Sequence, residues 1–228
     1  MNENSTITHV YFMPGMAANP TIFEHIKLPE NDYKIHWLKW KIPYHNECMH
    51  SYITRMLEDV VHPNPVLIGV SFGGVIVQEM AKLIAVKRLI LISTVKSKHE
   101  LPARMKFASK TGLYKILPTS LAGRLGDLEK LPVGEFTKKR ANLYKQYLSV
   151  SDKQYLDWAI QKMVCWDQEE PLEGTIHIHG DADIVFPIKN IENCIVVEGG
   201  THIMIINRFR WFNKYLPSLI AEGKMIEN

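Results

Sequence analysis

Short runs of apolar residues alternate along this chain with segments whose apolar positions recur every three or four residues. The runs are predicted strands at residues 9–13, 34–40, 66–70, 87–93, 175–179 and 194–198. Helical spacing lies between several of them, as in the segments from Met49 to Val61 and from Phe72 to Ile84. Strands that are apolar on both faces and alternate with helices are typical of a mostly parallel central sheet with helices on both faces. The predicted fold class is therefore α/β.

The composition fits one domain and excludes several function classes. The 228 residues are 46% hydrophobic, enough for a substantial core, and the formal net charge of +3 gives no case for nucleic-acid binding. The three cysteines are widely separated and odd in number, which argues against a disulfide framework and fits a reducing cytoplasm. No secretory signal and no membrane-spanning run of roughly 18 apolar residues is present. We therefore expect a soluble cytoplasmic protein, and the sequence leaves its oligomeric state open.

The alternation is interrupted between about residues 96 and 173. No apolar strand is evident there, while long side chains and scattered aromatic residues are frequent, so we predict a helical insertion. The lysines and arginines of this segment are interpreted as a solvated helix face, rather than as a site for an anionic leaving group.

One motif carries a candidate nucleophile. Gly69 to Gly73 read Gly-Val-Ser-Phe-Gly, which fits G-x-S-x-G, with a predicted strand before it and a predicted helix after it. A serine on such a strained turn needs small neighbours two residues away on each side, and Gly69 and Gly73 meet that need. The turn exposes Ser71 at the carboxyl edge of the sheet, where the helix that begins at Phe72 directs its N–H groups.

A serine nucleophile requires a general base, and the base requires a carboxylate that fixes its tautomer. Both residue types follow the last two predicted strands. Asp181 and Asp183 lie in the turn after residues 175–179, and His202 lies in the loop that begins the final helix. The loops at the carboxyl ends of three predicted strands therefore carry Ser71, the two aspartates and His202. Serine, acid and histidine follow one another along the chain in the order of a known class of catalytic triads.

On these residues the sequence resembles the α/β-hydrolase fold superfamily, specifically its lidded lipase, esterase and thioesterase-like branch. The resemblance implies a core of residues 1–95 and 174–228, with residues 96–173 as a helical lid over the catalytic edge. It also implies that Asp183, with Pro187 in its usual place, is the triad acid, and that Asp181 is the fallback.

The resemblance further implies two backbone N–H groups that stabilise an oxyanion, those of Met16 and Phe72. Met16 follows Pro14-Gly15, where the family usually has a histidine and a glycine.

The expected function is a serine hydrolase that cleaves a carboxylic ester or thioester through an acyl-enzyme on Ser71, with His202 as base and Asp183 as orienting acid. No metal or organic cofactor is implied, and the expected partner is a small-molecule acyl substrate. One alternative uses the same triad for carbon–carbon cleavage, lyase or perhydrolase chemistry, since a fold does not fix a reaction. Another is a non-catalytic protein that holds a hydrophobic ligand in the same pocket, against which the intact triad speaks.

The other histidines are given no catalytic role. His177 and His179 begin a pattern like the H-x-H-x-D-H motif of metallo-β-lactamase-type hydrolases, but Ala182 stands where its last histidine would be. We interpret both as buried strand residues that satisfy core hydrogen bonds. A further set is expected to consist of ordinary surface or strand residues: His9, His25, His36 and His62.

Overall fold

The computed structural model describes residues 7–116 and 147–226. In this part of the chain, six strands form one parallel sheet in the order β2-β1-β3-β4-β5-β6. Their bounds are β1 (Thr8–Met13), β2 (Tyr33–Trp37), β3 (Val66–Val70), β4 (Arg88–Ile92), β5 (Thr175–Gly180) and β6 (Ile195–Val197). The predicted α/β class with a parallel sheet is confirmed.

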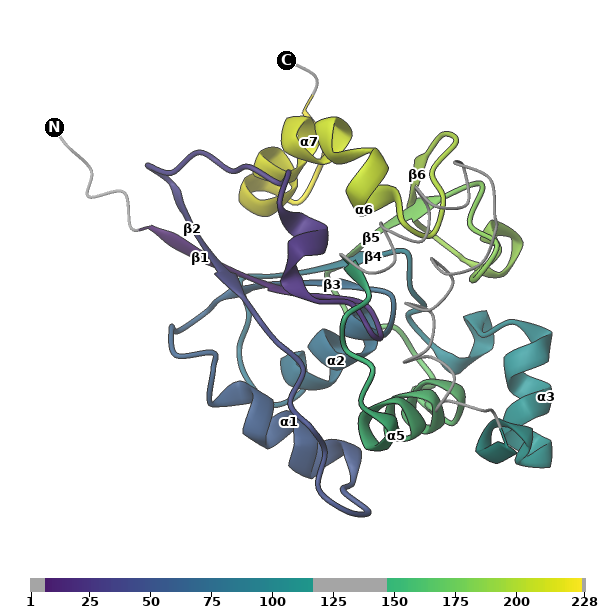
Figure 1. Cartoon of the computed structure of the whole chain (residues 1–228). Helices are drawn as coiled ribbons and strands as arrows, with labels where there is room; N and C mark the ends of the chain where they lie inside the picture. The colour runs from purple at the N-terminus through teal and green to yellow at the C-terminus, as the bar shows by residue number, and fades with distance from the viewer. Residues whose placement is uncertain (1–6, 117–146, 227–228) are drawn as a thin grey trace, which may run out of the picture.

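Helices cover both faces of the sheet (Figure 1). One face is covered by α1 (Met49–Leu57), α2 (Phe72–Ala81) and α5 (Lys153–Val164). The other is covered by the 3-10 helix η1 (Pro20–Phe23), α6 (Met204–Asn207) and α7 (Phe209–Glu222). The remaining short helices lie in the connections that follow β4 and β5: η2 (Lys98–Glu100), α3 (Ala103–Thr111), η3 (Leu113–Ile116) and η5 (Ile188–Asn190).

Two cores flank the sheet because successive side chains of a strand point to opposite faces. On β1, Tyr11 and Met13 pack into the core shared with α1, α2 and α5, while Val10 and Phe12 pack into the core shared with η1, α6 and α7. The central strands β3 and β4 are therefore apolar at nearly every position. Burial on both faces is why the strands appear in the sequence as continuous apolar runs.

Part of the predicted insertion belongs to the first of these cores. On α5, Trp158 is buried, its ring centroid lies 4.2 Å from that of Tyr52, and its indole N–H donates to the carbonyl of Glu47 at 2.8 Å. Helix α5 thus lies beside α2 as a covering helix of the sheet. A lid formed from residues 96–173 stays a prediction, since residues 117–146 lie outside the described residues.

Two further expectations concern cysteines and membranes. Cys48, Cys165 and Cys194 are all free thiols. Among the helices of residues 7–116 and 147–226, none combines the length and the apolar character that a membrane span requires.

Candidate active site

Ser71 follows β3 directly and has a strained backbone. Its φ of 53° and ψ of −125° lie where a residue with a side chain is seldom found. Three hydrogen bonds hold it there. The Ser71 N–H donates to the carbonyl of Ile92 at 3.0 Å, and the Ser71 carbonyl accepts from the N–H of Gly74 at 2.8 Å and the hydroxyl of Thr94 at 2.7 Å. These bonds hold the strained turn and so keep Ser71 at the carboxyl edge of the sheet.

The two glycines of the motif allow backbone segments to approach closely around this turn. A Cβ atom on Gly73 would lie 2.3 Å from the carbonyl oxygen of Pro14, and one on Gly69 would lie 2.4 Å from the carbonyl oxygen of Gly73. Both distances are shorter than any real carbon contact. The small neighbours expected from the motif are thus required by packing between β3, α2 and the loop after β1.

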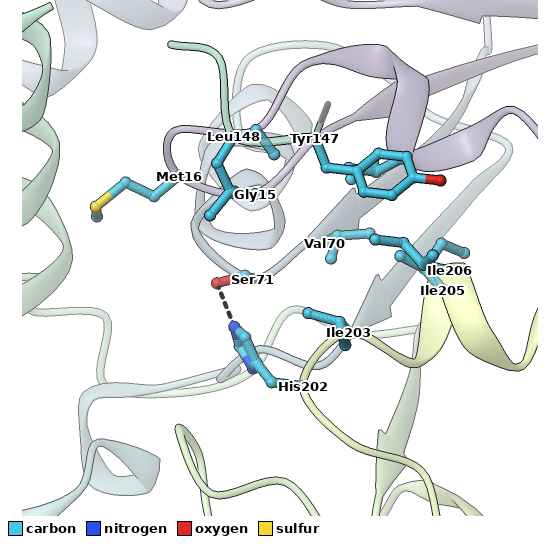
Figure 2. Close-up of a pocket in the computed structure, with 12 residues that line it drawn as sticks. Gly15, Met16, Val70, Ser71, Tyr147, Leu148, His202, Ile203, Ile205 and Ile206 are labelled. Atoms are coloured by element: carbon cyan, nitrogen blue, oxygen red, sulfur yellow. Dashed lines mark hydrogen bonds between the residues drawn. The ribbon is translucent and has the colours of Figure 1, made fainter. Parts of the chain in front are cut away.

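His202 connects Ser71 to Asp183 by hydrogen bonds, and Figure 2 shows the one to Ser71. Its Nε2 lies 3.0 Å from the Ser71 hydroxyl oxygen, and its Nδ1 lies 2.9 Å from Oδ2 of Asp183. A carboxylate only accepts, so Nδ1 carries the proton and Nε2 is left to accept from the hydroxyl. The structure therefore brings Ser71, His202 and Asp183 together, whereas Asp181 is exposed.

The Asp183 carboxylate is buried and held by three hydrogen bonds. Its Oδ1 accepts from the N–H groups of Val185 at 2.7 Å and Phe186 at 2.9 Å, while Oδ2 faces His202. Burial by itself raises the pKa of Asp183, but the hydrogen bond and charge of His202, together with the two N–H donors, lower it overall. The carboxylate is therefore ionised at neutral pH and fixed in orientation.

The loops that carry Asp183 and His202 are packed backbone to backbone. A Cβ atom on Gly180 would lie 2.1 Å from the carbonyl oxygen of Gly200, and the Ala182 N–H donates to that same oxygen at 3.0 Å. From α3, Arg104 donates to the carbonyl of Val185 at 2.6 Å. No spacing in the sequence indicated the contact of Arg104 with Val185, which joins α3 to the loop that carries Asp183.

His177 and His179 lie on β5 beneath the site. The His179 Nε2–H donates to the carbonyl of Phe186 at 2.8 Å, and its Nδ1 lies 3.3 Å from Nε2 of His177. Burial is the largest cause that lowers the pKa of both residues, so both rings are neutral at pH 7. The interpretation of His179 as a core residue that satisfies hydrogen bonds is confirmed. His177 Nδ1, in contrast, has no partner among the described residues.

The loop after β1 brings Gly15, the residue before Met16, beside Ser71. A Cβ atom on Gly15 would lie 3.3 Å from the Ser71 Cβ, and the Gly15 carbonyl accepts from the indole N–H of Trp40 at 3.0 Å. Phe72 is the first residue of α2, a position whose N–H has no partner within the helix. Neither the Met16 nor the Phe72 N–H donates to another residue in the described part of the chain. Both remain available to a ligand.

Trp40 was not singled out from the sequence, where residues 34–40 read as one strand. The strand ends at Trp37, and Trp40 lies beyond it, stacked on Phe72 with ring centroids 5.4 Å apart and planes 11° apart. Through its bond to Gly15 and its contact with Phe72, Trp40 connects the loop after β1 to the start of α2.

A cavity of about 210 Å³ opens beside Ser71. Aliphatic side chains from α6 and its preceding loop, from η1 and from the end of β3 form most of its wall, and the Ser71 hydroxyl lies at its edge (Figure 2). Its lining residues are Gly15, Met16, Ala18, Ile22, Val70, Ser71, Tyr147, Leu148, His202, Ile203, Ile205 and Ile206.

Comparisons with known proteins identify the architecture around this site. No protein-family model and no curated protein matches the sequence. A solved esterase (EaEST) from Exiguobacterium antarcticum is similar, with a TM-score of 0.64 and 18% identity over 96% of this chain and 93% of that one. A bromoperoxidase from Bacillus anthracis gives a TM-score of 0.63 at 17% identity over 96% and 93% of the two chains. An α/β-hydrolase fold protein from Burkholderia ambifaria gives 0.62 at 11% identity over 96% and 92%. With its parallel sheet and two helical layers, the chain has the α/β-hydrolase fold.

Proposed function

We propose that the protein is a serine hydrolase that cleaves a carboxylic ester or thioester. One observation carries this proposal: the unbroken hydrogen-bond chain from the buried Asp183 through His202 to the strained Ser71, which ends at the edge of an apolar cavity. A strained serine costs on the order of 1–3 kcal/mol, a cost with no evident benefit in a protein that only binds ligands.

The proposed reaction begins when Ser71 Oγ attacks the acyl carbonyl carbon while His202 Nε2 takes the hydroxyl proton. The imidazolium that forms is stabilised by Asp183, whose ionised carboxylate lies against Nδ1. His202 then returns its proton to the leaving alcohol or thiol. Water, deprotonated by His202, attacks the acyl-enzyme, and the carboxylic acid leaves as Ser71 recovers its proton.

The negative charge on the substrate oxygen is proposed to be stabilised by the backbone N–H groups of Met16 and Phe72. Their lack of other partners in the described chain supports this role, as does the short distance between Gly15 and Ser71. One such donor is worth about 3 kcal/mol in the transition state.

The cavity supports a short acyl group as the substrate's acid part. Its volume of about 210 Å³ is below the roughly 300 Å³ at which pockets for larger ligands begin.

Ile206, half-buried in the cavity wall, is a suitable position at which to test the size of the acyl group. With esters of graded chain length, Ile206→Ala should shift the preferred acyl chain upward, whereas Leu83→Ala, a surface change outside this cavity, should not. If Ile206→Ala keeps the wild-type preference for acyl chain length, the acyl group does not bind in this cavity.

A fluorophosphonate reagent tests the proposed nucleophile without knowledge of the substrate, because it reacts with activated serines. Intact mass and peptide analysis should show one adduct on Ser71 in the wild type. His202→Ala should label at least about 10²-fold more slowly, since it lacks the base, while His99→Ala, an exposed histidine elsewhere, should label normally. A folded wild type that leaves Ser71 unlabelled would contradict the proposal.

Perhydrolysis is a second candidate, because the same triad and acyl-enzyme would serve it and because a protein of this fold from Bacillus anthracis is named a bromoperoxidase, a class that uses peroxide. In this reaction hydrogen peroxide replaces water as the attacker of the acyl-enzyme, and a peracid leaves in place of the acid. Peracid formation measured at increasing peroxide concentration, with a short-chain ester as acyl donor, distinguishes the two. Acid as the product at every peroxide concentration would eliminate perhydrolysis.

The cytoplasm stays the predicted compartment, in keeping with three free thiols.

A further inference from the structure

Three histidines that are far apart in the sequence meet on the α1 side of the sheet, away from the catalytic edge. His9 lies near the start of β1, His36 on β2, and His62 in the connection between α1 and β3. Tyr11 pairs with His36 across the parallel strands, so His9, Tyr11 and His36 project from one face. One ring nitrogen from each histidine lies within 4.8 Å of the other two. No other three His, Cys, Asp or Glu side chains converge in this way within residues 7–116 and 147–226.

The contacts within this histidine cluster are short. His9 Nδ1 and His36 Nε2 lie 2.9 Å apart, and the ring of His62 stacks on that of His9 with centroids 3.4 Å apart. The Tyr11 hydroxyl lies 2.5 Å from Nδ1 of His62 and accepts from the Val61 N–H at 3.2 Å. Tyr11 therefore contacts the His62 ring through Nδ1 and leaves Nε2 of that ring for another partner.

Two histidines of the cluster, His9 and His36, favour the neutral form that a metal ligand needs. Burial, followed by the charge of His62, lowers the pKa of His9 and of His36, and Lys34 adds to the effect on each. The two rings are therefore neutral at pH 7, and the neutral imidazole is the form that binds metal ions. All three histidines are half-buried, so an ion can reach them from solvent.

We propose that His9, His36 and His62 bind one transition-metal ion of the group that imidazole favours, namely zinc, nickel or copper. Zinc bonds imidazole nitrogen at about 2.0–2.1 Å in a tetrahedron, which sets ligand nitrogens about 3.3 Å apart. The observed 2.9 Å between His9 and His36 is a few tenths of an ångström shorter, because a proton rather than a metal is shared there. The stacked rings of His9 and His62 lie side by side, so nitrogens of both rings cannot point at one ion. His62 therefore rotates about its side chain to direct Nε2 to the ion. Water fills the fourth position.

The proposed ion holds three separate segments of the chain together. It joins β2, the edge strand of the sheet, to β1 and to the connection before β3. The Tyr11 hydroxyl acts as the outer partner of His62, a position whose loss typically weakens metal affinity by about 10- to 100-fold.

Titration of the untagged, chelator-stripped full chain with Co²⁺ and Zn²⁺ tests the proposal. We expect one equivalent of Co²⁺ to bind with the visible d–d absorption of a low-symmetry site. The thiolate-to-cobalt charge-transfer band that ligation by the free cysteines would give should be absent. Zn²⁺ should displace the Co²⁺ and raise the midpoint of thermal unfolding.

Three single variants and one control test which residues hold the ion. Tyr11→Phe should weaken Co²⁺ binding by about 10- to 100-fold. His36→Gln and His62→Gln should each weaken it more than Tyr11→Phe does, and should abolish the Zn²⁺-dependent rise in the unfolding midpoint. His50→Gln, an exposed histidine on α1, should bind as the wild type does. Circular dichroism and fluorophosphonate labelling of Ser71 report whether each variant is folded. No Co²⁺ binding by folded wild type, or binding unchanged in both His36→Gln and His62→Gln, would overturn the site. Neither result bears on the proposed hydrolase.

Discussion

At the scale of single residues, Asp183 provides the sharpest test of the proposed triad. Asp183→Asn preserves shape, but the amide can donate to Nδ1 of His202 and so favours the tautomer that cannot accept from Ser71. We expect kcat for ester hydrolysis to fall about 10⁴-fold with KM little changed. Steady-state kinetics with a short-chain ester measures both parameters. Asp181→Asn, an exposed aspartate two residues away, is the matched control and should retain wild-type kinetics.

A second prediction at this scale concerns the turn at Ser71. Gly73→Ala places a methyl carbon 2.3 Å from the Pro14 carbonyl oxygen, so the loop that carries Met16 must move. We expect the free energy of unfolding to fall by about 1–3 kcal/mol, as for other overpacked sites, and Ser71 labelling to be lost. Urea denaturation and fluorophosphonate labelling measure the two effects. Gly112→Ala, at a glycine with no atom near its Cβ direction, should cost about 1 kcal/mol because of its φ of 74° and leave labelling intact.

At the scale of elements, the packing of α5 predicts that this helix unfolds together with the sheet rather than independently of it. Trp158 of α5 is buried against Tyr52 and donates to the Glu47 carbonyl. Trp158→Ala should therefore lower the global free energy of unfolding by about 3–5 kcal/mol. The exposed Ile116→Ala in η3 should change it by no more than about 0.5 kcal/mol. A Trp158→Ala protein with wild-type stability would show that α5 unfolds independently of the core.

The sequence predicted the strands and the three hydrogen-bonded residues because each carries a local signal. Continuous apolar runs mark buried parallel strands, and Ser71, Asp183 and His202 each follow such a run. The position of α5 could not be predicted, since its apolar spacing is the same whether it packs on a sheet or on a lid. The roles of Trp40 and Arg104 were likewise not predicted, because their contacts with Gly15 and Val185 form only when segments distant in the sequence meet.

The histidine cluster was still harder to predict from the sequence. His9 and His36 lie on strands, as expected, but their meeting depends on the parallel register of β1 and β2 and on the placement of the connection with His62. No motif spacing encodes it.

At the scale of the whole molecule, the buried histidines of β5 make stability depend on pH. The pKa of His177 lies well below 6.5 in the folded protein, so below about pH 6.5 the unfolded chain binds a proton that the folded chain does not. Stability therefore falls as pH decreases through this range, by up to about 1.4 kcal/mol per pH unit for each such group. His177→Gln should flatten the dependence between pH 7.5 and 5.5 in urea denaturation. An identical slope in both proteins would show that His177 is not a source of it.

The order of strands in the sheet has a kinetic consequence. β5 pairs with β4 across a long stretch of intervening chain, with Leu89 opposite Thr175, and β6 then pairs with β5. Pairings between distant segments form slowly, because loop closure precedes any gain from contact. Asp183 and His202 follow these last strands, while Ser71 follows β3. During refolding, helical circular dichroism should thus recover before Ser71 becomes reactive, so the onset of labelling marks the moment at which the chain has completed its topology.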